Sequence, residues 1–174
     1  MEVLVVVDMQ KDFVTGALGT PEAKAVVPAV CEKIKSFEGR VIFTRDTHQK
    51  DYPETEEGRH LPVPHCIEGS DGWELVPPVA ALAAGREIIN KPTFGSRALG
   101  RHLEELDAEE PVTGITLIGL CTDICVISNA LLVKAFLPNV PITVDAACCA
   151  GVTPGSHCTA LDAMRACQIN IENG

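Results

Sequence analysis

The sequence predicts an α/β protein, a three-layer α/β/α sandwich around a mostly parallel sheet of about six strands. Three observations carry this prediction. Short β-branched runs alternate with segments of helical periodicity along the whole chain. Hydrophobic residues make up 46% of the sequence and aromatic residues only 4%, a bias typical of aliphatic strands buried between helices. The length of 174 residues suits a single domain spanning residues 1–174.

The first half of the chain opens with a β-branched run at 2–7, which predicts a strand that stops at the polar Asp8. Residues 21–37 have apolar side chains at helical spacing, begin with a proline and precede a glycine, so a helix is expected there. A second strand is expected at 40–44. Residues 45–72 form a polar segment rich in proline, glycine and histidine, and loops of this length in compact domains are often functional.

The second half repeats the alternation. The same patterns predict helices that begin at proline or at serine and threonine caps, and strands built from short aliphatic runs. The expected helices are 76–85, 96–106, about 123–137 and 153–167, and the expected strands are 87–90, 114–120, 141–145 and 168–172.

Charge and hydropathy exclude several classes of protein. Lys and Arg number 14 against 24 Asp and Glu, which gives a formal charge of −10, and no basic run occurs. Such a chain is a poor binder of nucleic acid or anionic membrane surfaces. No apolar stretch approaches the roughly twenty residues of a membrane span. The N-terminal "MEVLVVVDMQ" lacks the positive region and cleavage site of a signal peptide, so we expect a cytoplasmic protein.

Eight cysteines occur, without any C-x-x-C spacing that would indicate a metal site. In a cytoplasmic protein most are expected to be reduced and buried as small hydrophobic residues. Cys121 and Cys125 stand apart because they follow the expected strand 114–120.

Chemically capable residues follow four of the expected strands. These residues are Asp8, Asp46 with His48, Lys91 and Cys125. Parallel sheets bind ligands outside the carboxyl ends of their strands, so the fold is expected to gather these side chains at one edge.

Asp8, Lys91 and Cys125 form a complete set for nucleophilic acyl chemistry. A thiol near a helix N-terminus, with an ammonium nearby, is expected to have a lowered pKa. A carboxylate within reach can remove the thiol proton and return it to a leaving group. Each residue alone also has an ordinary structural interpretation, and their shared placement favours the catalytic one.

A second group lies in the polar segment. Asp46 and His48 are two residues apart, and His65 follows in "PVPH". One carboxylate and two imidazoles with open positions suit Zn²⁺, Mn²⁺ or Fe²⁺. Further candidate ligands are Glu54, Glu57 and His60.

These motifs resemble the isochorismatase-like cysteine hydrolase superfamily and, within it, the nicotinamidases. The resemblance spans nearly the whole chain. It implies that "DMQKDF" supplies the catalytic Asp8, that "NKPTFGS" supplies the catalytic Lys91, and that "GLCTDICV" supplies the nucleophile Cys125.

The resemblance also implies a site for one divalent metal ion. "DTH" and "PVPHC" match the family's ligand motifs, so Asp46, His48 and His65 are the implied ligands. Glu54 is the first candidate for a fourth ligand, with Glu57 as an alternative. Zn²⁺ is the first candidate ion and Mn²⁺ and Fe²⁺ are alternatives. In the family the metal binds the pyridine nitrogen of nicotinamide and thereby presents the carboxamide to the thiolate.

The resemblance implies, further, a cis peptide between Leu120 and Cys121. In the family this turn directs the backbone N–H groups of Cys121 and Cys125 into an oxyanion hole. Phe13 matches a pocket phenylalanine, and Leu61 and Pro62 stand where nicotinamidases commonly place an aromatic residue. An aliphatic wall is expected there.

The sequence therefore predicts a cysteine amidohydrolase acting on a small amide such as nicotinamide or pyrazinamide, with a role in NAD salvage. Relatives often form dimers or tetramers, so a homo-oligomer is compatible with the resemblance. A second hypothesis is an amidase of the superfamily that acts on a carbamoyl or ureido substrate. A third is a thiol redox protein using Cys121 and Cys125, and a fourth is a catalytically idle scaffold.

Overall fold

The computed structural model describes residues 1–174. Its centre is a six-stranded sheet in which every neighbouring pair is parallel, with the order β3-β2-β1-β4-β5-β6. The predicted α/β fold is confirmed. The strands are β1 (Glu2–Val7), β2 (Arg40–Asp46), β3 (Glu87–Lys91), β4 (Gly114–Leu120), β5 (Ile142–Ala150) and β6 (Asn170–Glu172).

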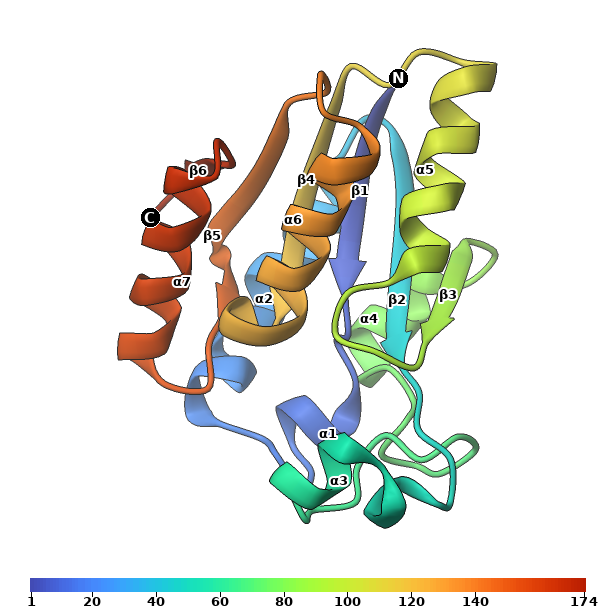
Figure 1. Ribbon diagram of the computed structural model, residues 1–174, viewed down its shortest axis with the longest axis vertical. Coiled ribbons are helices and arrows are strands. Elements are labelled where there is room, and N and C mark those ends of the chain that lie inside the picture. Colours follow the sequence, from blue (N-terminus) through green and yellow to red (C-terminus); the bar gives the residue numbers. More distant parts are fainter.

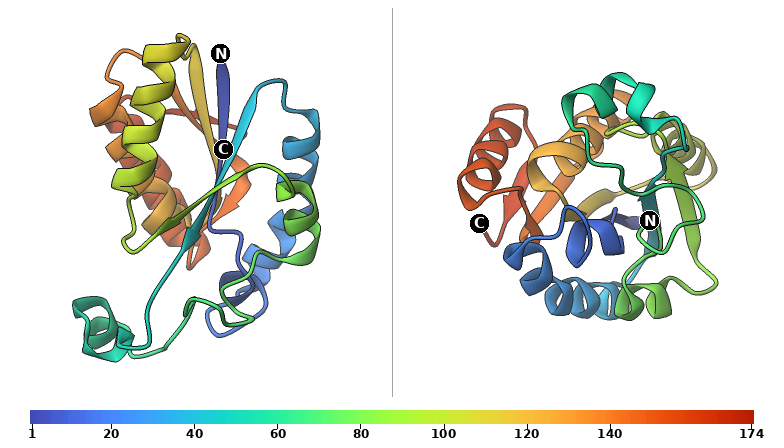
Figure 2. Two further views of the ribbon diagram at one scale, coloured as in Figure 1. Left: turned by 90° about the vertical axis from the view of Figure 1, so that its right-hand side faces the viewer. Right: turned by 90° about the horizontal axis from the view of Figure 1, so that it is seen from below.

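Helices cover both faces of the sheet, as the edge-on view in Figure 2 shows. One layer holds α5 (Arg97–Glu109), α6 (Ile127–Phe136) and α7 (Pro154–Ala166), which lie in front of the sheet in Figure 1. The other holds α2 (Pro21–Ser36) and α4 (Pro77–Ala83). The short helices α1 (Lys11–Val14) and α3 (Glu56–His60) lie beyond the carboxyl ends of the strands.

The central strand β1 divides its side chains between two cores. Val3, Val5 and Val7 pack into the core beneath α5, α6 and α7, whereas Leu4 and Val6 pack into the core beneath α2 and α4. All five are fully buried. Alternate strand residues point to opposite faces, so a continuous aliphatic run is what a strand covered on both sides requires.

The two largest differences from the expected element boundaries lie at the end of β5 and at the start of α6. β5 continues to Ala150 because its register against β4 shifts, so that Leu117 pairs with Val144 while Gly119 pairs with Cys149. The chain around Cys125 begins as a π-helical turn, η2 (Thr122–Val126), before α6. Such wide turns occur frequently at functional sites.

The polar segment after β2 is more structured than expected. It contains a 3₁₀ turn, η1 (Tyr52–Glu54), followed by α3, whose N-cap Thr55 accepts a hydrogen bond from the Gly58 amide. The segment returns to the sheet edge where His48 bridges to Ile67. None of the helices combines the length and apolar composition that crossing a membrane requires.

Candidate active site

Asp8 lies at the end of β1, where its backbone adopts a left-handed conformation with φ of 48°. Aspartate tolerates this region better than most residues. The side chain is fully buried, and its Oδ1 accepts a 2.6 Å hydrogen bond from the Thr44 hydroxyl. Burial raises the pKa of Asp8, although the neighbouring ammonium of Lys91 opposes this rise.

Lys91 lies at the end of β3 and joins the predicted residues into one cluster. Its Nζ is 2.6 Å from Asp8 Oδ2 and 3.3 Å from Cys125 Sγ, and it also lies 3.3 Å from Asp46 Oδ1. The side chain is fully buried. Burial alone would lower the pKa of Lys91, but the charges of Asp8, Cys125 and Asp46 raise it, so the ammonium form persists.

Cys125 lies within the π-helical turn and is 4% exposed. The lowered pKa that we expected for its thiol is wrong. Burial and the charge of Asp8 hold the pKa of Cys125 well above its ordinary value, and Lys91 compensates only in part. The resting group is therefore a thiol, and Asp8 and Cys125 share Lys91 as a common neighbour.

The Leu120–Cys121 peptide is cis, as the resemblance implies. Gly119 precedes it with φ of 115°, and a Cβ at this position would lie 2.1 Å from the Val7 carbonyl oxygen. Only glycine permits this close approach of β4 to β1. The Cys121 amide that follows donates to no acceptor in the protein, so its N–H remains available to a ligand.

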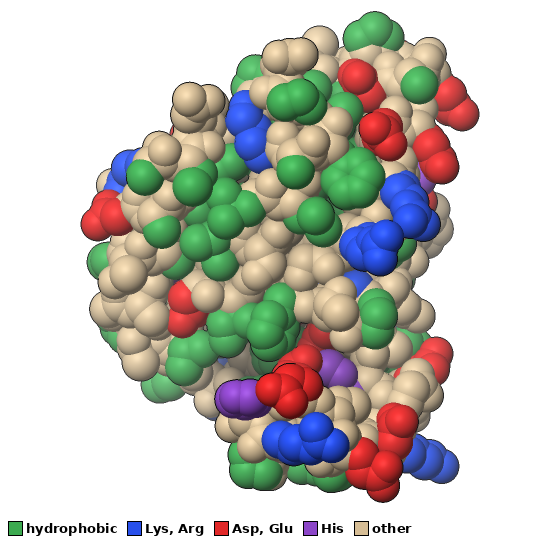
Figure 3. All heavy atoms as spheres, in the orientation of Figure 1, with side chains coloured by type: hydrophobic (Ala, Val, Ile, Leu, Met, Phe, Trp, Pro, Cys, Tyr) green, Lys and Arg blue, Asp and Glu red, His purple; other side chains and the backbone are tan.

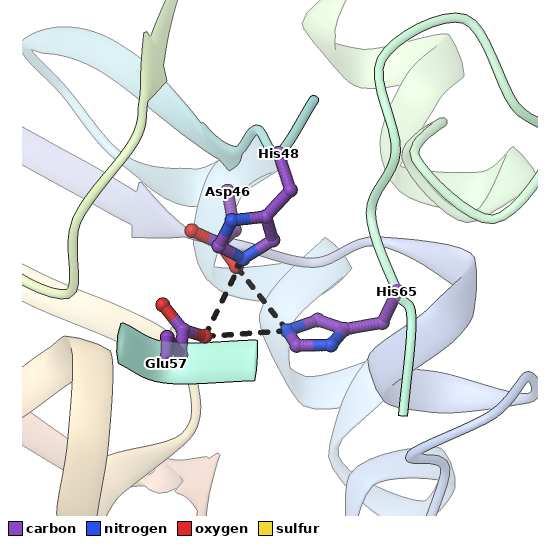
Figure 4. Close-up of side chains that lie close together, drawn as sticks. All are labelled: Asp46, His48, Glu57 and His65. Carbon is purple, nitrogen blue, oxygen red and sulfur yellow. Dashed lines mark ion pairs between the residues drawn. The ribbon is translucent and has the colours of Figure 1, made fainter. Parts of the chain in front are cut away.

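Four side chains form a compact donor group beside this cluster (Figure 4). Nε2 of His48 lies 2.9 Å from Asp46 Oδ2 and 3.4 Å from Glu57 Oε1. Nε2 of His65 lies 3.6 Å from each of the same two oxygens. The structure thus brings together Asp46, His48 and His65.

The fourth member of this group is Glu57, which the sequence analysis gave as the alternative to Glu54. Glu54 lies in η1 and is exposed, whereas Glu57 lies in the first turn of α3 and points at the two imidazoles. His60, the other candidate, is also separate from the group: its Nδ1 contacts the Glu56 carbonyl oxygen at 3.0 Å.

The donor group fits a divalent metal ion. Metal–ligand distances of about 2.0–2.2 Å in a tetrahedral site place neighbouring ligand atoms roughly 3.4 Å apart. The four distances between the imidazole nitrogens and the carboxylate oxygens run from 2.9 to 3.6 Å. His65 Nδ1 contacts the Val63 carbonyl oxygen at 2.8 Å, which leaves Nε2 free to bind a metal. His48 Nε2 is buried and makes no hydrogen bond.

The charge of the donor group also fits a bound cation. Burial would lower the pKa of His48, but the close carboxylates of Asp46 and Glu57 raise it to about 9. Burial would likewise raise the pKa of Asp46, yet His48, His65 and Lys91 hold it below its usual range. Two carboxylates therefore face this space, and a cation there would balance them.

The motif "DMQKDF" holds the donor group in place through its other polar residues. The Gln10 side chain is fully buried; its Oε1 accepts from the Asp46 amide at 2.7 Å and its Nε2 donates to the Asp46 carbonyl at 2.8 Å. Asp12 Oδ2 accepts from the amide of Cys66, next to His65. Gln10 and Asp12 therefore position the backbone beside two of the donors, Asp46 and His65.

Asn129 is a residue of the site that the sequence analysis missed. It is fully buried in α6; its Nδ2 donates to the carbonyls of Cys125 and Phe94, and its Oδ1 accepts from the Ser96 amide. It therefore ties the turn that holds Cys125 to the loop after β3. Its spacing of four residues from Cys125 was the available indication.

A cavity of about 680 Å³ opens onto Cys125 and the donor group. Phe13 and Leu61 line it as expected, but Pro62 does not. The Val63 amide donates to the Leu61 carbonyl across Pro62, and this tight turn leaves Pro62 exposed. Apolar walls that the sequence analysis did not foresee come from Leu18, Phe94, Ile124 and Val152.

The Isochorismatase domain family matches residues 2–172. Comparison with curated protein sequences gives no match.

Several solved structures share the fold over nearly their full lengths. A pyrazinamidase of Pyrococcus horikoshii in complex with zinc is 29% identical, with a TM-score of 0.81, and the match covers 98% of this chain and 97% of that one. A nicotinamidase/pyrazinamidase from Bacillus subtilis is 26% identical, with a TM-score of 0.84 and 99% of both chains covered. An N-carbamoylsarcosine amidase from Thermoplasma acidophilum is 29% identical, with a TM-score of 0.76, over 98% of this chain and 95% of that one.

The domain match spans all six strands, and the named relatives share their arrangement with the chain described above. The chain belongs to the isochorismatase family of hydrolases.

Proposed function

We propose that this protein is a metal-dependent cysteine amidohydrolase that converts nicotinamide to nicotinic acid and ammonia, as a cytoplasmic enzyme of NAD salvage. One observation carries the proposal: Cys125, which belongs to the buried cluster with Asp8 and Lys91, lines the same cavity as three members of the four-donor group. The likeness to the nicotinamidase of Bacillus subtilis and the pyrazinamidase of Pyrococcus horikoshii supports it.

In this proposal Asp8 accepts the proton of the Cys125 thiol, and the thiolate attacks the carboxamide carbon. The negative charge that develops on the amide oxygen is met by the backbone N–H groups of Cys121 and Cys125. Asp8 returns the proton to the amine, the C–N bond breaks, and ammonia leaves a thioester on Cys125. Asp8 then takes a proton from water as the water oxygen attacks the thioester. The C–S bond breaks, the acid leaves, and the proton on Asp8 passes to the Cys125 thiolate, which restores the thiol and the carboxylate.

Lys91 stabilises this sequence through charge. The pKa of Cys125 is raised by burial, so the thiolate exists only when its proton has moved to Asp8. With its Nζ 2.6 Å from Asp8 and 3.3 Å from Cys125, the ammonium balances whichever of the two groups carries the negative charge.

Asp46, His48, Glu57 and His65 would hold the divalent ion, with Zn²⁺ as the first candidate. When bound, such an ion supplies a Lewis acid for a ring nitrogen of the substrate. Phe13, whose ring packs against the His65 ring with a centroid distance of 5.5 Å, would contact one face of a heteroaromatic ring.

A carbamoyl amidase is the second candidate, because the N-carbamoylsarcosine amidase is as similar in sequence as the pyrazinamidase. Two features of the site favour the first candidate. The four-donor group suits a metal that a ring nitrogen can bind, and no lysine or arginine lines the cavity to pair with a substrate carboxylate.

An ammonia-release assay tests the proposal. Nicotinamide, pyrazinamide and N-carbamoylsarcosine are compared with the protein as purified, after chelation, and after addition of Zn²⁺, Mn²⁺ or Fe²⁺. We expect release from the two aromatic amides, loss after chelation, and recovery on addition of metal. Turnover of the carbamoyl compound alone, or equal turnover with and without metal, would contradict the proposal.

A further inference from the structure

The mouth of the cavity is unusually apolar for an exposed surface. Five large hydrophobic side chains in the chain are exposed, and three of them line this one cavity: Leu61, Phe94 and Val152. We call these three residues the outer rim. Single exposed hydrophobic residues are ordinary, but a cluster around a cavity marks a surface that binds something. Figure 3 shows hydrophobic side chains gathered along one side of the hollow and acidic and histidine side chains along the other.

The outer rim is held in place by hydrogen bonds to residues around the site. The Leu61 carbonyl accepts from the hydroxyl of Tyr52, which is 1% exposed. The Phe94 carbonyl accepts from the fully buried Asn129. The Val152 amide donates to Asp123, two residues before the nucleophile. Three segments far apart in sequence thus present apolar side chains from fixed backbone, which is how a preformed pocket is built.

The charges around the cavity exclude one class of substituent. Its ionisable lining residues are Asp46, Glu56, Glu57, His60, His65, Cys121 and Cys125, with no lysine or arginine among them. A substrate carboxylate would meet two carboxylates near the rim without an arginine or lysine partner. A neutral apolar group would meet hydrophobic side chains instead.

The size of the cavity points in the same direction. Its volume of about 680 Å³ lies in the middle of the range of sites that enclose drug-sized ligands, about 300–1,000 Å³. A single-ring amide is smaller than the drug-sized ligands that cavities of this volume enclose, so it fills only part of the cavity. A substrate that fills the cavity as far as the outer rim must extend beyond one ring.

We propose that the preferred substrate is a neutral heteroaromatic carboxamide whose ring carries an apolar substituent, and that this substituent packs against the outer rim. The inference rests on the proposed amidase activity and names the substrate class within it. Burying about two methylene groups in the complex is worth roughly tenfold in kcat/KM, so the preference over nicotinamide should be at least of this order.

The test compares ammonia release from nicotinamide with release from nicotinamides that carry a propyl, phenyl or carboxymethyl group on a ring carbon away from the carboxamide. We expect kcat/KM for the propyl or phenyl compounds to exceed that for nicotinamide by about tenfold or more. The carboxymethyl compounds should fall below nicotinamide.

Two matched variants assign the preference to the rim. Leu61→Ala removes a rim side chain that is 37% exposed, and Leu131→Ala removes one in α6 that is 38% exposed and does not line the cavity. The ratio of kcat/KM for the propyl compound to that for nicotinamide should fall at least about threefold in Leu61→Ala. It should stay unchanged in Leu131→Ala. Phe94→Ala provides a second rim variant if Leu61→Ala folds poorly.

The outcomes separate this inference from the proposed function. Turnover of nicotinamide with no gain from any apolar substituent would overturn the inference and leave the amidase activity standing. If no amide is turned over, calorimetric binding to the intact protein decides the inference alone: tighter binding of the propyl compound that Leu61→Ala weakens supports it, and equal binding overturns it. A change of oligomeric state in Leu61→Ala, with no change of the ratio, would assign the rim to a contact between copies.

Discussion

The two halves of the site are built on different parts of the fold. Asp8 follows β1, Lys91 is the last residue of β3, and Cys125 lies in the turn after β4; the side chains of Asp8 and Lys91 are completely buried. Glu57 and Leu61 come from α3 and its C-cap, a five-residue helix in the segment between β2 and β3. Asp46 and His48 connect the two, because β2 ends at Asp46 and the loop begins there.

In the proposed function, the strand half carries out the reaction and the loop half determines which substrate binds. The strand half holds the Asp8 carboxylate and the Cys125 thiol within 2.6 to 3.3 Å of the Lys91 Nζ atom, and in the proposed reaction small shifts of these groups would cost rate. The loop half supplies the fourth donor, Glu57, and one residue of the outer rim, Leu61. Substitutions at these positions should change which molecule is bound. Loops on rigid scaffolds commonly carry this second task.

The largest effect is expected from breaking the strand half. Asp8→Asn removes the proton acceptor and should lower kcat for ammonia release by about a hundredfold to ten-thousandfold. Cys125→Ala removes the nucleophile and should lower it further. Cys31→Ala, which removes a buried thiol from α2, is the matched control and should keep full activity. Steady-state assays measure all three; substantial turnover by Cys125→Ala would contradict the assignment of the nucleophile.

The sequence allowed the strand half to be predicted residue by residue. In a parallel sheet the residue after each strand falls at one edge, so locating the ends of β1, β3 and β4 placed Asp8, Lys91 and Cys125 together. It did not predict the raised pKa of Cys125, because burial is a property of the packed site. Nor did it predict Asn129, whose bonds cross to the loop after β3.

The loop half could be predicted only in part. Glu54 and Glu57 share one polar segment, and nothing in local composition tells which turns inward. The choice depends on how α3 packs on η1: a Cβ at Gly58 would lie 2.0 Å from the Tyr52 carbonyl oxygen, so glycine allows the close contact that fixes the direction of Glu57. Pro62 was misplaced for a similar reason, because the turn at Leu61–Val63 exposes it.

A smaller effect is expected from breaking the loop half. Glu57→Gln removes one carboxylate from the donor group and should weaken binding of Zn²⁺. Changing a group that merely orients a metal ligand costs about tenfold to a hundredfold in affinity, and removing a ligand should cost no less. Glu54→Gln makes the same change three residues away at an exposed site and should bind metal normally. Calorimetric titration with Zn²⁺ compares them, and weaker binding in Glu54→Gln than in Glu57→Gln would reverse the assignment.

The smallest effect is expected in β5, the strand that ends two residues before Val152 of the outer rim. Asp145 in β5 is 2% exposed, and its carboxylate accepts from Lys33 of α2 at 2.8 Å and from Asn173 at 2.9 Å. Burial opposes ionisation, but these two hydrogen bonds hold the pKa of Asp145 below its ordinary 3.8. A carboxyl group with a lowered pKa stabilises the folded state above its unfolded-state pKa, and this stability is lost as the pH falls through the folded-state value.

We therefore expect Asp145→Asn to lower the free energy of unfolding by about 1–3 kcal/mol at pH 7, as for a buried hydrogen bond to a charged group. The difference in free energy of unfolding between this variant and the wild type should become smaller as the pH falls below 3.8, the ordinary pKa of an aspartate. The pKa of Lys33 is raised, chiefly by its hydrogen bond to Asp145. The contribution of Lys33 to stability is therefore fully present until the pH exceeds 10.5, the ordinary pKa of a lysine. Asp162→Asn, which breaks an exposed pair with Arg165, should change stability little at any pH. Urea denaturation across this range measures the free energy of unfolding of both variants. A difference from the wild type that grows in acid would contradict the prediction, because it would show that folding raises the pKa of Asp145.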